Sequence, residues 1–195
     1  MIRMYLSDTG SFLARFGRDE RGSSTIEFVL FVPFIFTFWL SSFEMGMMMV
    51  RQTMLDRGVD LTVRIIRLNQ MVDSAGLPVI SRENLRRSIC FYSGGLVPDC
   101  DDRLRVEMIR SDPHNWAATA GSATTEGDCV NVDEPAAPAT GVFEAGRANE
   151  LIILRVCALI EPLSLTAGLG ATMQRRSGDF YALFTMAAFA VEPDN

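Results

Sequence analysis

Lysine is absent from this chain of 195 residues: all 18 basic residues are Arg, and the only His is His114. Without Lys the chain cannot form a Schiff base, a Ser-Lys dyad or a Lys-containing phosphate loop. A single His excludes zinc motifs with two His, and the four Cys include no CxxC pair. These absences argue against an enzyme, and we expect no cofactor, no metal and no small-molecule substrate.

The charge balance is acidic, with a formal net charge of -6, so nucleic acid is not an expected partner. Apolar residues make up 48% of the chain and charged residues 22%, which is far too apolar for a disordered protein. The length suits one ordinary globular domain.

A long apolar run lies near the N-terminus. Residues 28–43 carry no charge, which as a helix is about 24 Å, short of a hydrocarbon core of about 30 Å. Continuation through Glu44 to Val50 gives about 34 Å. We therefore predict a transmembrane helix over 23–50, kinked at Pro33, with Glu44 near the far interface where its carboxylate reaches water.

Beyond the membrane, apolar residues recur at steps of three, four and seven from Val50 to Val72. This period predicts an amphipathic extension of the helix over 51–75, lying against a head domain. The whole helix would run from about Ile26 to Val72, roughly 70 Å, and end at Asp73–Pro78.

Residues 76–195 predict an α+β head with a small antiparallel sheet. We expect a helix over 81–92 stopped by two Gly, strands over 104–109, 151–160 and 180–191, and a turn at 168–173. Residues 112–148 are rich in small residues, Pro and acids, and predict a long mobile loop that includes a surface-exposed His114.

All four Cys follow the apolar run, and an even number on one side favours an oxidising compartment. The N-terminus would then be cytoplasmic and the head would lie outside the inner membrane, stabilised by disulfides. Three pairings are possible; we favour Cys90 with Cys100, which closes a short loop, and Cys129 with Cys157. Four buried free thiols in a cytosolic domain are the alternative.

The segment from Arg21 to Phe28 has Gly22 followed five residues later by Glu27 and then an aromatic residue. It resembles the processing site of type IV prepilins. The resemblance implies that residues 1–22 are a leader and that a prepilin peptidase cuts between Gly22 and Ser23. It also implies that the Glu27 carboxylate pairs with the free amino terminus of a neighbouring subunit.

The longer stretch from residue 16 to 53 resembles the TadE/TadG-like segment of the tight-adherence pilus machinery, as an R-G-x(4)-E-F, Pro and E-x-G pattern. The residues that carry it are Gly22, Glu27, Phe28, Pro33, Glu44 and Gly46. Phe28 stands where Flp-type pilins have Tyr. The length favours a TadE- or TadF-like minor pilin with a pilin-like fold. Its implied partners are the inner membrane, the peptidase, other pilins or pseudopilins and the assembly platform.

Several alternatives stay open at this point. A carboxylate in the first turn of a helix is favoured by the macrodipole alone, which would explain Glu27 without any assembly role. The aromatic residues between 28 and 43 are either lipid-facing or a helix-packing surface. Asp99, Asp101 and Asp102 form either a solvated acidic turn or a calcium site. The chain as a whole could be an unprocessed signal-anchored periplasmic sensor or scaffold.

Overall fold

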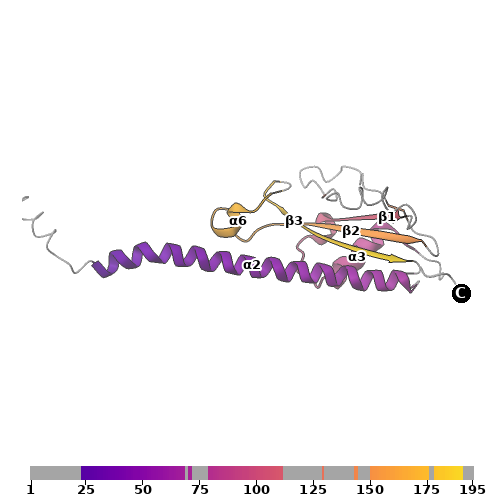
Figure 1. Ribbon diagram of the computed structural model, residues 1–195, viewed down its shortest axis with the longest axis horizontal. Helices are drawn as coiled ribbons and strands as arrows, with labels where there is room; N and C mark the ends of the chain where they lie inside the picture. Colours follow the sequence, from indigo (N-terminus) through magenta and orange to yellow (C-terminus); the bar gives the residue numbers. More distant parts are fainter. Residues whose placement is uncertain are drawn as a thin grey trace, which may run out of the picture.

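The structure is a computed structural model that describes residues 23–68, 70–71, 79–111, 129, 143–144, 150–175 and 178–190. Figure 1 shows a long helix with a small sheet lying against its C-terminal part and a short helix beside its middle. The elements in chain order are α2 (Ser23–Arg67), α3 (Arg82–Tyr92), α4 (Cys100–Arg103), β1 (Leu104–Ser111), β2 (Leu151–Ile160), α6 (Gly168–Thr172) and β3 (Tyr181–Ala190). The predicted α+β fold is confirmed.

Helix α2 is one element of 45 residues, about 67 Å long, and it continues through Pro33 without interruption. It ends at Arg67, five residues short of the predicted end at Val72. The backbone N–H of Gln70 donates to the carbonyl of Ile65 at 3.0 Å, a closing bond typical of helix C-termini. Arg64 and Arg67 lie in the last turn, where positive charge is favourable. The predicted stop at 73–78 lies outside the described residues.

The three strands form one antiparallel sheet in the order β1-β2-β3. Leu104 of β1 lies opposite Ala158 of β2, and Val156 of β2 lies opposite Thr185 of β3. The predicted strands are confirmed, with β1 two residues longer than expected. Along the edge of β1, Phe143 forms a bridge with Met108, and the N–H of Glu144 donates to the Met108 carbonyl at 3.0 Å.

Helix α3 begins and ends where the sequence predicts. Ser81 precedes it, and its Oγ accepts a hydrogen bond from the N–H of Asn84 at 3.2 Å. Gly94 and Gly95, just beyond its end, adopt φ values of 68° and 73°, which glycine tolerates without a Cβ clash. The acidic residues 101–102, expected as a turn, belong to α4.

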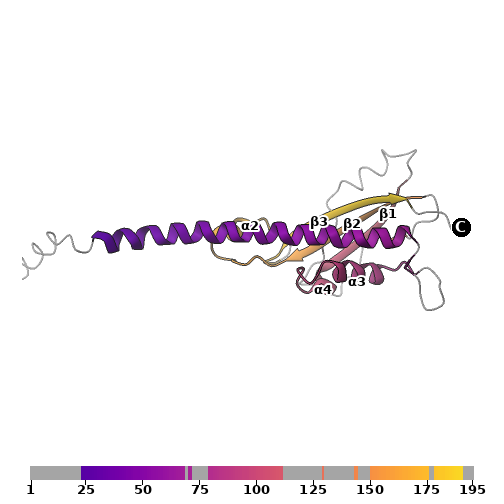
Figure 2. The same ribbon diagram turned by 90° about the horizontal axis from the view of Figure 1, so that it is seen from below.

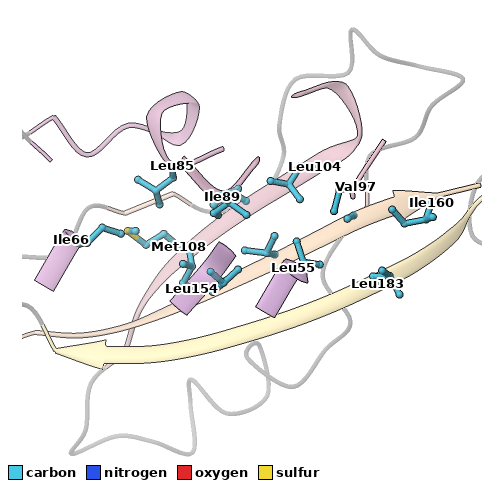
Figure 3. Close-up of a cluster of buried hydrophobic side chains, with 14 of the residues drawn as sticks. Leu55, Ile66, Leu85, Ile89, Val97, Leu104, Met108, Leu154, Ile160 and Leu183 are labelled. Atoms are coloured by element: carbon cyan, nitrogen blue, oxygen red, sulfur yellow. The ribbon is translucent and has the colours of Figure 1, made fainter. Parts of the chain in front are cut away.

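The core lies where one face of the sheet meets the C-terminal part of α2 and the inner side of α3. Figure 3 shows side chains from all three elements pointing toward one another, and Figure 2 shows α3 running beside α2. The fully buried members include Leu55, Val59, Ile66, Leu85, Ile89, Met108, Leu154 and Ile160. The predicted amphipathic half of the helix therefore forms part of the hydrophobic core of the head.

Two disulfides stabilise the head. Cys90 of α3 pairs with Cys100 of α4, and Cys129 pairs with Cys157 of β2, with Cα–Cα distances of 5.7 and 5.6 Å. This is the pairing that the sequence favoured, and no free Cys remains. Apart from Cys129, Phe143 and Glu144, the segment 112–148 that was predicted to be a mobile loop lies outside the described residues, as does His114.

Helices α2 and α3 approach each other closely at Gly58. A Cβ at this position would lie 2.6 Å from Ser93 Oγ and 2.8 Å from the carbonyl oxygen of Ile89. Contacts this short do not occur between real side chains, so one of the helices would have to move.

We expect Gly58→Ala to lower the free energy of unfolding by about 1–3 kcal/mol, because it overpacks a buried helix contact. Gly46→Ala in the same helix is the matched control, since no atom lies within 4 Å of its added Cβ. That control should be neutral or stabilising by up to about 1 kcal/mol. Thermal and denaturant unfolding of the full chain in detergent measures both, and equal stabilities would contradict the predicted contact.

Candidate membrane anchor and the docking site on the long helix

The N-terminal half of α2 presents apolar side chains to its surroundings. Phe28, Phe34 and Phe38 are 68%, 75% and 76% exposed, and most of their apolar neighbours up to Val50 are exposed as well, whereas Leu40, Met47 and Met48 are half-buried. Within the described residues this helix is the one that is long and apolar enough to cross a membrane. Such exposure favours lipid as the surroundings of these aromatic residues.

Glu27 and Phe28 lie near the N-terminal end of this exposed stretch. Because α2 begins at Ser23, Glu27 comes after the first helical turn. The favourable effect of the macrodipole on a carboxylate decays within that turn, so it accounts for Glu27 less well than the sequence suggested. Both side chains are exposed, and Gly22 of the predicted processing site lies outside the described residues.

Glu44 is not placed as the sequence predicted. Its side chain is only 4% exposed, whereas we expected a carboxylate reaching water at the interface. The segment between β2 and β3 covers it, and Glu44 Oε1 accepts a hydrogen bond from the backbone N–H of Leu163 at 2.9 Å. The prediction of a water-exposed Glu44 is therefore wrong, because a partner from a distant part of the chain replaces the water.

A second contact lies one turn earlier on α2. Ser41 Oγ accepts a hydrogen bond from the N–H of Leu169 at 3.1 Å and donates to the Thr37 carbonyl at 2.8 Å. Two N–H groups of the β2–β3 segment are thus satisfied by side chains of α2. Figure 1 shows the result: α6 lies beside α2, away from the sheet and toward the N-terminal half of the helix.

Two glycines permit this close approach. A Cβ on Gly168 would lie 2.7 Å from Ser41 Oγ, and a Cβ on Gly170 would lie 2.7 Å from both carboxylate oxygens of Glu44. Gly168 also has a φ of 66°, which favours glycine. The predicted turn at 168–173 is in fact the short helix α6, held against α2 at positions where only glycine fits.

Arg51 fixes the segment where it leaves the sheet. Its Nη1 donates to the carbonyl of Glu161 at 3.2 Å and to the Tyr181 hydroxyl at 3.4 Å. Glu161 follows the end of β2 and Tyr181 begins β3, so Arg51 lies where the chain leaves the sheet and where it returns. We call residues 161–175 the docking segment.

One of the acidic residues considered for calcium, Asp99, is paired with an arginine, and so is Glu107 on the neighbouring strand β1. Asp99 pairs with Arg103 at 2.9 Å, and Glu107 faces Arg155 at 3.7 Å across the sheet. In the described ranges, no group of three or more His, Cys, Asp or Glu side chains is arranged to hold a metal ion.

Residues 22–64 match the family described as TadE-like protein. This stretch is a TadE-like region. No curated protein and no solved structure gives a significant match.

The TadE-like region coincides with α2 and includes Glu27, Phe28 and Glu44. It confirms the family resemblance read from the sequence and links the protein to the assembly of a tight-adherence pilus. Together with the exposed apolar half of α2, it supports a protein anchored in the membrane by a single helix.

Sequence reasoning identified Glu44 as part of the E-x-G pattern but missed the docking segment that binds it. One available signal was the lack of charge between Glu161 and Arg175, in a segment that has Gly168 and Gly170 but no strand pattern. That signal does not say where the segment docks, because nothing local in the sequence connects it with a helix turn about 120 residues earlier.

We expect Glu44→Leu to release the docking segment, because it leaves the N–H of Leu163 buried without an acceptor, at a cost of about 1–3 kcal/mol. Glu44→Gln keeps a carbonyl oxygen in place and should be affected less. Trypsin cleavage after Arg175 in detergent reports the release, with a rate about 5–30 times higher for a loss of 1–2 kcal/mol. Cleavage after Arg87 on α3 is the internal control. Equal cleavage after Arg175 in the Leu and Gln variants would contradict the role of this hydrogen bond.

Proposed function

We propose that this protein is a minor pilin or pseudopilin of a tight-adherence type IV pilus, matured by a prepilin peptidase between Gly22 and Ser23. The observation that carries the proposal is the TadE-like region itself, which begins at Gly22 and covers the exposed apolar half of α2. Cleavage between Gly22 and Ser23 would make Ser23 the new amino terminus. Glu27 would then be the fifth residue of the mature chain.

The exposure of Glu27 supports a role in assembly. A carboxylate on the outer surface of α2 is accessible to a neighbouring subunit, and in lipid its attraction to a free amino terminus is much stronger than in water. Phe28 beside it would pack against the same neighbour. Glu44 would contribute indirectly, by holding the docking segment of its own chain.

The head supplies the other part of the proposal. Two disulfides are expected to form in an oxidising compartment, so the head would lie on the periplasmic or outer side of the inner membrane. The protein would act by incorporation into a complex with other pilins and the assembly platform, and not by catalysis.

Cleavage is tested by Gly22→Leu, which should leave residues 1–22 attached because a large side chain obstructs the peptidase site. The retained leader adds about 2.4 kDa, since 21.6 kDa over 195 residues is about 111 Da per residue. Gly17→Leu is the matched control within the leader and should be processed normally. Intact-mass analysis after expression in the pilus-forming host measures both. Maturation of the Gly22→Leu protein to Ser23 would disprove the proposed site and favour the unprocessed signal-anchored scaffold.

Assembly is tested separately by Glu27→Gln, which keeps the shape of the side chain but removes its charge. The mature mass should be normal, whereas recovery with the other pilus subunits should be lost, because an unpaired amine in lipid costs several kcal/mol. Glu83→Gln, on the surface of the head, is the control for loss of a carboxylate. Normal co-isolation of the Glu27→Gln protein would rule out the ion pair.

The orientation has its own test. Protease added outside spheroplasts should degrade the head, because two disulfides favour a location in the oxidising compartment outside the inner membrane. Immunoblotting for the head measures this, with a cytoplasmic protein as the control for lysis. A head that survives until the membrane is permeabilised would reverse the proposed orientation.

A further inference from the structure

The docking segment has an unusual composition for a connection on the surface of a head domain. Residues 162–174 carry no charge, while Glu161 precedes them and Arg175 follows them. Leu163 is 52% exposed, although the adjoining Pro162 is buried. A water-exposed connection of this length would ordinarily contain charged residues, so its surroundings need an explanation.

The position of the docking segment along the axis of α2 explains its lack of charged residues. Glu27 and Arg51 lie at the two ends of the apolar stretch of α2. Between them, residues 28–50 span about 34 Å, and their one charged residue is the buried Glu44. Ser41 and Glu44 lie ten and seven residues before Arg51, which is about 15 and 10 Å along the helix. A hydrocarbon core of about 30 Å between the two charges includes both positions.

The docking segment therefore lies beside the part of α2 that has the exposure and composition of a membrane span. A Cβ on Gly168 would lie 3.6 Å from the carbonyl oxygen of Thr37, which is one helical turn closer to the N-terminus than Ser41. The figures agree with this placement, because α6 lies beside the middle of α2 and not beside the sheet (Figure 1).

Protein groups satisfy several of the backbone polar groups of the segment. Irregular backbone at membrane depth is tolerated only where protein satisfies its polar groups. The N–H groups of Leu163 and Leu169 donate to α2 side chains, and Arg175 Nη2 donates to the carbonyl of Leu165 at 3.1 Å. Arg175 also pairs with Asp179 at 2.6 Å, which marks the return of charge where the segment leaves this level.

We propose that residues 162–174 enter the head-side leaflet of the bilayer beside α2, as a re-entrant segment whose exposed side is covered by lipid chains. Lipid is the occupant that fits, because the exposed residues of the segment are all uncharged and include Leu163 and Ala171, beside the exposed apolar residues of α2. The segment would fix the depth of the head at the membrane, and Glu44 would be an internal ligand of its backbone.

The experiment uses three single-Trp versions of the full chain, reconstituted in phosphatidylcholine and phosphatidylglycerol vesicles. Trp116 is replaced by Phe in all of them. The first keeps Trp39 as the membrane reference; the other two carry Trp39→Phe with either Leu163→Trp or Phe91→Trp. Phe91 on α3 is 78% exposed and serves as the matched reference for water. Quenching by lipids brominated on their acyl chains and by aqueous acrylamide is measured for each.

We expect the Trp at 163 to behave like Trp39, with strong quenching by brominated lipid and a several-fold lower acrylamide constant than the Trp at 91. Ala171→Trp, at an exposed position of α6, repeats the measurement at a second site in case the first substitution disturbs docking. If both positions behave like 91 in a protein with both disulfides formed, the segment lies in water and the inference is wrong. The result does not depend on cleavage after Gly22, so its failure and that of the proposed function are distinguishable.

Discussion

Burial of one stripe of α2 against the sheet is the interaction on which the rest of the head depends. Leu55, Val59, Thr62 and Ile66 recur at steps of four and three, which places them on one side of the helix, and each is at most 1% exposed. The sheet and α3 both pack on this stripe, so neither has a core without it. The same helix continues without a break into the apolar N-terminal half, so the head and the predicted anchor share one continuous element.

The two halves of α2 have different surroundings. Toward its N-terminus the aromatic side chains remain exposed, and toward its C-terminus the apolar side chains are covered by protein. The hydrophobic effect drives both arrangements, since lipid and a protein core each remove apolar surface from water. The turn around Glu44 lies between the two halves. There the docking segment packs against the helix and begins its burial by protein.

Glu27 and Glu44 are both carboxylates on the apolar helix, but their surroundings assign them to different tasks. Glu44 is buried and bonded to a backbone N–H of its own chain, so it has a structural partner already. Glu27 is exposed on the outer surface of the helix, at the end away from the head. A charged group in lipid requires a partner, and for Glu27 our proposal assigns that partner to another subunit.

The sequence by itself determined the elements of this protein. The apolar run, the helical period after it, the caps of α3 and the three β-rich segments were predicted because each depends on local spacing. The TadE-like pattern was readable for the same reason, since Gly22, Glu27 and Glu44 lie within one continuous stretch. Tertiary structure alone decided the surroundings of Glu44 and the conformation of residues 168–172. Those depend on a contact between segments about 120 residues apart, and a hydrogen bond across that separation leaves no period or spacing in the sequence.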